Sequence, residues 1–178
     1  DLQTGSGPTT VGGTLAADRN VISGNGGDGV IIWNSNGNTV IGNYIGTDVT
    51  GNAAIGNDAD GIAMGSGSAN NTIGQPGAGN VLSGNGNDGF ENDATGAGNT
   101  VHANMIGLGA DGTTNVGNGR YGVVIYNGAN NTAIGGSGAG EGNVISGNVQ
   151  AGVIIDGNSN AATTANTIAG NYIGTDAS

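Results

Sequence analysis

Most residues of this chain that are able to do chemistry are carboxylates, and several of them fall on one predicted face. Side chains of a strand alternate between its two faces. Along one recurring apolar run, this alternation places five polar or aromatic residues outward: Trp33, Glu91, Asp93, Tyr126 and Asp156. Carboxylates beside aromatic rings suit sugar binding, and paired carboxylates hydrolyse glycosidic bonds. These five residues are therefore the candidate ligand face.

A second acidic group flanks the segment GTDVTGNAAIGNDADG, residues 46–61. It consists of Asp48, Asp58 and Asp60. Hard oxygen ligands in a flexible loop suit Ca²⁺, so these residues are the candidate metal site. The competing interpretation is a surface loop with Asx-turns at its corners. No pattern in the chain requires a cofactor.

The charge balance excludes two classes of partner. Thirteen acidic residues stand against two basic ones, Arg19 and Arg120, for a formal net charge of -11. Nothing is available to neutralise phosphates, so nucleic-acid binding and attraction to an anionic membrane are both excluded. No apolar stretch is long enough for membrane insertion. The chain has no Cys and hence no disulfides.

Three short apolar runs, each bounded by Asn, Asp or Gly, recur in a fixed order. The NTV-type runs centre on Val11, Val40, Ile73, Val101, Ile134 and Ile168. The YIG-type runs contain Ile22, Ile45, Leu82, Ile106, Ile145 and Ile173. The DGV-type runs contain Val30, Ile62, Phe90, Val123 and Val153, with Leu2 at the place of a further one.

The spacing of these runs predicts the fold. NTV-type runs are 29, 33, 28, 33 and 34 residues apart, and a unit of that size cannot bury its apolar side unless copies stack. Short Val- and Ile-rich runs favour strands over helices. We therefore predict one all-β domain over residues 1–178, a right-handed parallel β-helix of three sheets with five to six coils. A two-strand coil, with Val or Ile every 19 to 24 residues, is the alternative register.

Asn and Gly recur at the corners of the predicted coils. Asn precedes every YIG-type run, at Asn20, Asn43, Asn80, Asn104, Asn143 and Asn171. Stacked amides bond one another along the axis of a β-stack, which predicts an asparagine ladder. Gly precedes every DGV-type apolar residue, at Gly29, Gly61, Gly89, Gly122 and Gly152, where we expect a corner without room for a side chain.

The runs N-T-[VI]-x-G-N and D-G-[VI] resemble the repeats of pectate-lyase-like and NosD-like β-helix proteins and of bacterial mannuronan epimerases. The phrases GNVISGN, NYIGTD and GNDADG resemble repeat regions of large secreted bacterial surface proteins. The resemblance covers nearly the whole chain. It implies the β-helix fold, but unrelated functions occur on that scaffold.

The catalytic motifs of these families are not matched. The lyases use acidic Ca²⁺ ligands with an Arg or Lys base, and this chain has no Lys. The epimerases carry YG-[FIV]-D-P-H, whereas residues 121–126 here read YGVVIY, without Asp or His. The single His, His102, lies in an NTV-type run and is expected to point outward. The sequence therefore predicts that the protein is not an enzyme.

These observations together favour an extracellular structural β-solenoid. The first run is the partial one at Leu2 and the last is Tyr172-Ile173, so we expect open ends that stack on copies of the chain or on neighbouring repeats. This predicts a fibre-forming subunit or a repeat segment of a cell-surface or adhesive protein. The alternative is a polysaccharide-binding or polysaccharide-modifying β-helix. A minor alternative is ice binding by a stacked Thr row: Thr10, Thr39, Thr72, Thr100 and Thr167.

Overall fold

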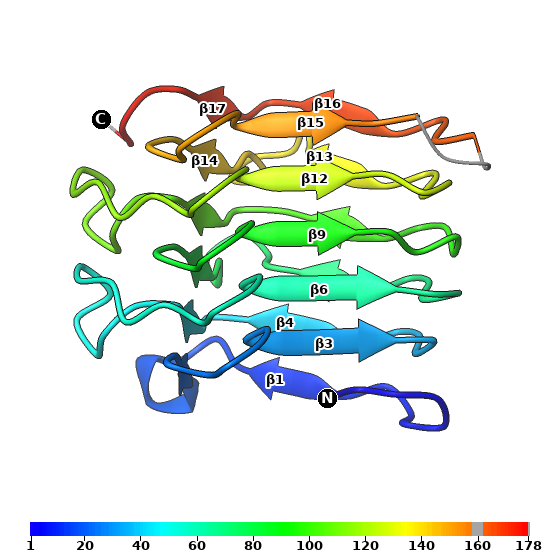
Figure 1. The fold of residues 1–178 in the computed structure, drawn as a ribbon, viewed down its shortest axis with the longest axis horizontal. Helices are drawn as coiled ribbons and strands as arrows, with labels where there is room; N and C mark the ends of the chain where they lie inside the picture. The colour runs from blue at the N-terminus through cyan, green and yellow to red at the C-terminus, as the bar shows by residue number, and fades with distance from the viewer. Residues whose placement is uncertain (158–161, 178) are drawn as a thin grey trace.

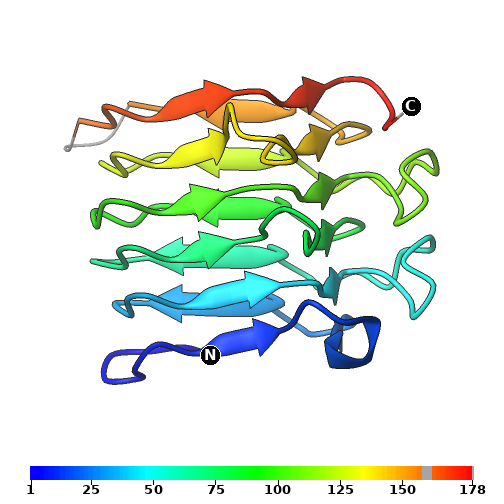
Figure 2. The same cartoon turned by 180° about the vertical axis from the view of Figure 1, so that it is seen from behind.

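The computed structural model describes residues 1–157 and 162–177 and shows a β-solenoid of about five turns. Figure 1 shows the coils stacked one above another, and Figure 2 shows the opposite side of the same stack. Three parallel sheets run along the stack, one for each type of apolar run. The three-sheet, all-β prediction is confirmed.

Each sheet collects one run type, and we name it accordingly. The NTV sheet contains β1 (Thr10–Gly12), β4 (Thr39–Ile41), β7 (Thr72–Ile73), β10 (Thr100–Val101), β13 (Ala133–Gly135) and β16 (Thr167–Ala169). The YIG sheet contains β2 (Val21–Ile22), β5 (Tyr44–Ile45), β8 (Val81–Leu82), β11 (Met105–Ile106), β14 (Val144–Ile145) and β17 (Tyr172–Ile173). The DGV sheet contains β3 (Val30–Trp33), β6 (Ile62–Gly65), β9 (Phe90–Asn92), β12 (Val123–Ile125) and β15 (Val153–Ile155).

The register decides between the two predicted coils. Val21 pairs with Tyr44, its own run type one coil later, and Val11 pairs with Val40. The two-strand alternative would have paired Val21 with Val40 and is therefore wrong. Like stacks on like because each side chain then meets one of its own shape in the core.

The core lies inside the triangle of sheets. Its inward-facing side chains are fully buried in the middle coils, among them Ile62, Phe90, Val101 and Ile106. Asn92 also points inward, at a position where the other coils carry apolar residues. The amide of Asn92 donates to Thr132 Oγ1 at 2.9 Å and accepts from the Ala94 N–H, so this buried polar side chain is satisfied.

The links between strands alternate with a period of two coils. In the coil of β4 and β5, the link between these two strands is short, and residues 46–61 form a long loop from β5 to β6. Two coils later, residues 107–122 form the corresponding long loop from β11 to β12. The two long loops protrude on the same side of the solenoid (Figure 1). The Ala110 N–H donates to Gly51 O at 2.9 Å, so the loops contact each other across the intervening coil. This alternation accounts for the repetition of GNVISGN-like sequence at about twice the coil length.

The predicted corner glycines lie where the backbones of successive coils approach closely. A Cβ added to Gly89 would lie 2.8 Å from Gly122 O and 2.7 Å from the Ile106 side chain. At Gly29, Gly61 and Gly122 the added atom would likewise meet the carbonyl of the corner glycine in the next coil. The helical content of the described residues is one 3₁₀ turn, η1 (Ala16–Asp18), and no helix there is long enough to cross a membrane.

Candidate functional site

Three asparagine ladders run along the corners of the solenoid. The predicted ladder is present: Asn43 Nδ2 donates to Asn80 Oδ1 at 3.1 Å, and Asn80 Nδ2 donates to Asn104 Oδ1 at 3.0 Å. The same bonding continues from Asn20 to Asn171. The other two ladders contain Asn25, Asn57, Asn85, Asn118 and Asn148, and Asn38, Asn71 and Asn99. Their role is structural, because each amide satisfies backbone groups of adjacent coils.

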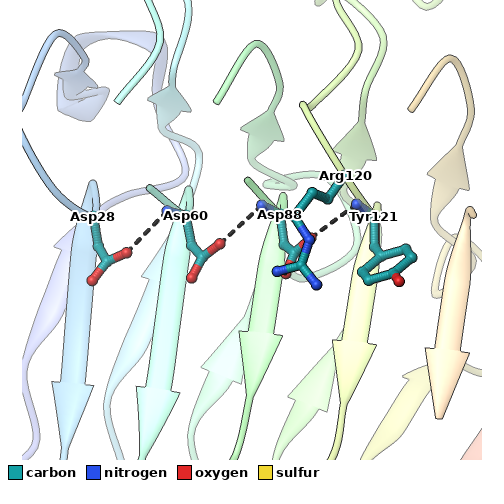
Figure 3. A network of polar contacts seen from close by, with 5 residues as sticks. All are labelled: Asp28, Asp60, Asp88, Arg120 and Tyr121. Atoms are coloured by element: carbon teal, nitrogen blue, oxygen red, sulfur yellow. Dashed lines mark hydrogen bonds and ion pairs between the residues drawn. The ribbon is translucent and has the colours of Figure 1, made fainter. Parts of the chain in front are cut away.

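A fourth ladder is made of carboxylates and leads to the candidate site. The Asp60 N–H donates to Asp28 Oδ1, and the Asp88 N–H donates to Asp60 Oδ1, both at 2.9 Å. The Tyr121 N–H completes the row by donating to Asp88 Oδ1 at 2.9 Å. Figure 3 shows these side chains in line at the start of the DGV strands. Each residue precedes a corner glycine, so the repeat itself places the carboxylates one coil apart.

Three carboxylates converge where this ladder meets the outward face of β9. Oxygens of Asp60, Asp88 and Glu91, one from each, lie within 4.8 Å of one another. The Asp88 side chain is fully buried, and its Oδ2 has no hydrogen-bond partner. The nearest cation is Arg120, whose Nη1 lies 3.8 Å from that oxygen, beyond hydrogen-bonding distance. We name Asp60, Asp88 and Glu91 the carboxylate cluster.

Burial and mutual repulsion disfavour the charged forms of this cluster. Burial, together with the charge of the neighbouring Asp60 carboxylate, raises the pKa of Glu91 to about 7. Burial likewise raises the pKa of Asp60 to about 6. The pKa of Asp88 is also raised by burial, against the opposing effects of the Tyr121 N–H and Arg120. A site that raises several carboxyl pKa values together favours binding either protons or a cation.

A shallow hollow of about 220 Å³ lies beside the cluster on the DGV sheet. Glu91, Val124 and Ile154 occupy the same register position on β9, β12 and β15. Tyr126 and Asp156 lie two residues further on, directly after β12 and β15. Asp88, Arg120 and Tyr121 complete the lining. Tyr126 hydrogen-bonds Glu91, and burial together with the Glu91 charge raises the pKa of the Tyr126 hydroxyl.

The remaining two residues of the predicted ligand face, Trp33 and Asp93, do not line this hollow. Trp33 is half-exposed on β3, and its ring lies over Gly65, with which it is in register. Asp93 follows β9 and lies against the same glycine, and burial raises its pKa. The predicted face is thus divided between a Trp33–Asp93 part and a Glu91–Tyr126–Asp156 part.

The three residues of the predicted metal site, Asp48, Asp58 and Asp60, do not form one group in the structure. Asp60 joins Asp88 and Glu91, whereas Asp48 and Asp58 do not belong to this group. Asp48 Oδ1 accepts hydrogen bonds from the Thr50 hydroxyl at 2.7 Å and from the N–H groups of Asn52 and Ala53, so it closes its own loop. The Thr50 hydroxyl is the largest cause that lowers the Asp48 pKa. The Asx-turn interpretation describes this residue well.

Two further sequence features have defined places. The predicted Thr row is in register along the NTV sheet: Thr10, Thr39, Thr72, Thr100, then Ala133 and Thr167. His102 follows β10, and its Nε2 is buried without a hydrogen-bond partner in the described part of the chain.

Sequence reasoning missed Asp88, Arg120 and Tyr121 as site residues. A signal for Asp88 was present, because Asp28, Asp60 and Asp88 precede the corner glycine in three successive coils. Arg120 had no such signal, since it reaches back to the previous coil from the end of a loop.

Comparison of the chain with protein-family models, with curated proteins and with solved structures finds no match in any of the three.

Proposed function

We propose that this chain is a structural β-solenoid segment whose end coils associate with further coils of the same kind, in an extracellular fibre or surface protein. The observation that carries the proposal is the exposure of inward-facing residues in the coil of β16 and β17. Ile168 and Ile173 are 45% and 49% exposed. Their register partners one coil earlier, Ile134 and Ile145, are fully buried.

The energetics favour covering this end. Burying a fully exposed isoleucine side chain stabilises by about 1.5–3 kcal/mol. Ile155, at 40% exposed, extends the same apolar surface onto β15. Covering three half-exposed isoleucines therefore contributes on the order of 3 kcal/mol. Pairing of the free strand edges with a further coil adds to this.

The opposite end has a complementary shape. The DGV sheet has five described strands where each other sheet has six, and Leu2 forms a parallel bridge with Ile32 ahead of β3. A second copy stacked on β16 and β17 would bring its Leu2 segment to the position of the sixth DGV strand. For the isolated chain we infer that a second copy is the occupant, and in a longer chain neighbouring repeats would take the same place. Stacking of this kind that does not close gives a fibre.

The test is the size of the purified chain by light scattering over a concentration series, followed by negative-stain imaging. We expect fibres with an axial repeat of about 27 Å, from roughly five and a half coils at ~4.8 Å each. The double variant Ile168→Lys, Ile173→Lys should be monomeric. The control is Val49→Lys, which alters an apolar side chain that is 77% exposed on a loop and should associate normally. A monomeric wild-type chain at all concentrations would overturn the proposal.

The second candidate is a polysaccharide-binding or polysaccharide-modifying β-helix, as in the families that the repeats resemble. The observation in its favour is the hollow beside Glu91 and Tyr126. Its volume of about 220 Å³ lies below the ~300–1,000 Å³ of most ligand sites, which is why we rank it second. Binding of neutral oligosaccharides that is lost in Tyr126→Ala, with association unchanged, would favour this candidate.

A further inference from the structure

The carboxylate cluster has a geometry and a charge that a divalent cation would satisfy. We propose that Asp60, Asp88 and Glu91 bind Ca²⁺ and that the ion links the coil of β6 to the coil of β9. Asp60 precedes β6, while Asp88 precedes β9 and Glu91 lies on it. The site differs from the Asp48 loop, and it does not depend on whether the chain forms fibres.

The spacing of the oxygens fits Ca²⁺ better than smaller ions. Ca²⁺–oxygen bonds are about 2.3–2.6 Å long, so two ligands on opposite sides of one ion are about 5 Å apart. The cluster oxygens lie within 4.8 Å of one another, so small side-chain movements bring all three onto one ion. Mg²⁺, with bonds of about 2.0–2.1 Å, would require the oxygens to move closer together.

The second line of evidence is a buried oxygen that the fold leaves without a hydrogen bond, with only the ion pair to Arg120 at 3.8 Å. Asp88 Oδ1 accepts the Tyr121 N–H, but Asp88 Oδ2 is buried and has no hydrogen-bond partner. A buried carboxylate oxygen without a partner is costly, and native sites usually satisfy it with a hydrogen bond or an ion. The ladder fixes the side chain in this position, because Oδ1 is held by the next coil.

Charge also favours a dication. If all three carboxylates are ionised, Arg120 compensates one charge and leaves two. The Arg120 side chain is about half-exposed, and its guanidinium lies over the Tyr121 ring at 5.0 Å from the centroid, so it is free to move toward solvent. Asp93 adds further negative potential at Glu91.

The site is testable on the full chain with Tb³⁺, which substitutes for Ca²⁺ and luminesces when excited through a nearby tyrosine. Tyr121 and Tyr126 line the adjoining hollow and would act as donors. We expect Tb³⁺ luminescence that Ca²⁺ displaces more effectively than Mg²⁺. We also expect the melting temperature to rise with Ca²⁺ concentration, because a ligand that binds only the folded state stabilises it.

The variants are chosen so that the ladder survives. Asp88→Asn keeps the oxygen that accepts the Tyr121 N–H, as Asn does in the three neighbouring ladders, and Glu91→Gln keeps the shape of the side chain. Each should weaken Tb³⁺ and Ca²⁺ binding at least tenfold. Asp28→Asn is the matched control, since it changes the same ladder one coil away and should bind as the wild type does. Arg120→Gln should bind several-fold more tightly, because the competing cation is removed.

Three results would overturn the proposal. The first is the absence of Ca²⁺-displaceable luminescence and of a melting shift at millimolar Ca²⁺. The second is equal binding by the wild type, Asp88→Asn and Glu91→Gln, which would place the ion at another group such as the loop of Asp48. The third is Ca²⁺ binding that is weakened in Arg120→Gln, since Arg120 would then support the site rather than compete with the ion. Circular dichroism of each variant excludes loss of the fold as the cause.

Discussion

Asp88 serves two purposes through its two carboxylate oxygens. Oδ1 accepts the Tyr121 N–H and so holds two coils together, while Oδ2 is buried without a hydrogen bond. The two oxygens can be separated by substitution, because Asn retains the first function and loses the charge of the second.

We predict that Asp88→Ala and Asp88→Asn differ strongly in stability. Alanine leaves the Tyr121 N–H without its described acceptor, which costs about 1–3 kcal/mol. Asparagine keeps the acceptor and removes repulsion within the cluster, so in metal-free buffer at pH 8 it should be neutral or stabilising. Urea unfolding of both variants measures the difference. Equal destabilisation would show that the charge, and not the ladder bond, is what Asp88 contributes.

The raised pKa values of the cluster predict the pH dependence of stability in the presence of a chelator. Glu91 has a folded-state pKa of about 7 against an ordinary value of 4.5, and Asp60 has about 6 against 3.8. Between these limits the folded state binds more protons than the unfolded state. The free energy of unfolding should therefore fall as the pH rises from about 4 to about 7.

Denaturant unfolding at several pH values checks this sign. Glu91→Gln is the control, since it should reduce the slope between pH 5 and 7 and leave other titrations in place. A free energy of unfolding that rises with pH across this window would contradict the assignment.

At the scale of the element, the ladders explain why such short strands are stable. All six described YIG strands are two residues long, yet each is preceded by an Asn, and the four inner ones bond the coils on both sides. Asn80 accepts from the Asn43 N–H and amide, and it donates to Val40 O and to Asn104 Oδ1. One buried side chain thus satisfies groups in three successive coils.

We predict that Asn80→Ala destabilises far more than Asn171→Ala. At position 80 the substitution leaves several buried polar groups unsatisfied, each costing about 1–3 kcal/mol, so a total of roughly 3 kcal/mol or more is expected. At position 171 the ladder ends among the described residues, and its neighbours Ala169 and Tyr172 are exposed. Thermal unfolding of the two variants side by side provides the measurement. Equal losses would show that the ladder contributes little beyond its backbone contacts.

The elements and their registers could be predicted from sequence because the repeat carries them. Val30, Ile62 and Phe90 recur after the same Asp-Gly pair, and the structure pairs them as that spacing indicates. The carboxylate cluster could not be predicted in the same way. The cluster forms because the outward-pointing Glu91 lies close to Asp60 and Asp88, the carboxylates that precede the corner glycines of two coils. The spacing of residues in the sequence does not reveal this distance, because the contact crosses a corner of the sheet.

At the scale of the whole molecule, stability is expected to be graded along the axis. In a solenoid each coil contacts only its neighbours, so an end coil has one stabilising interface where an inner coil has two. The inner coils contain the fully buried residues Ile73, Phe90 and Ile106, whereas β16 is exposed along its length.

Hydrogen exchange tests this gradient. We expect amides of β7 to β11 to exchange most slowly and those of β16 and β17 to exchange first under dilute conditions. If copies stack as proposed, protection of β16 and β17 should increase with protein concentration while that of β7 to β11 stays constant. Uniform protection at all concentrations would indicate a single cooperative unit without end-specific opening.

The asparagine ladders also give the molecule a direction. Asn43 Oδ1 accepts from Asn20, and Asn43 Nδ2 donates onward to Asn80, and the other two ladders run in the same sense. Their side-chain dipoles therefore add along the axis, as peptide dipoles do in a helix. The two ends of the solenoid carry opposite partial charges, so a dimer made by joining like ends would oppose them. An assembly that continues the ladders is consequently polar, with a distinct growing face at each end.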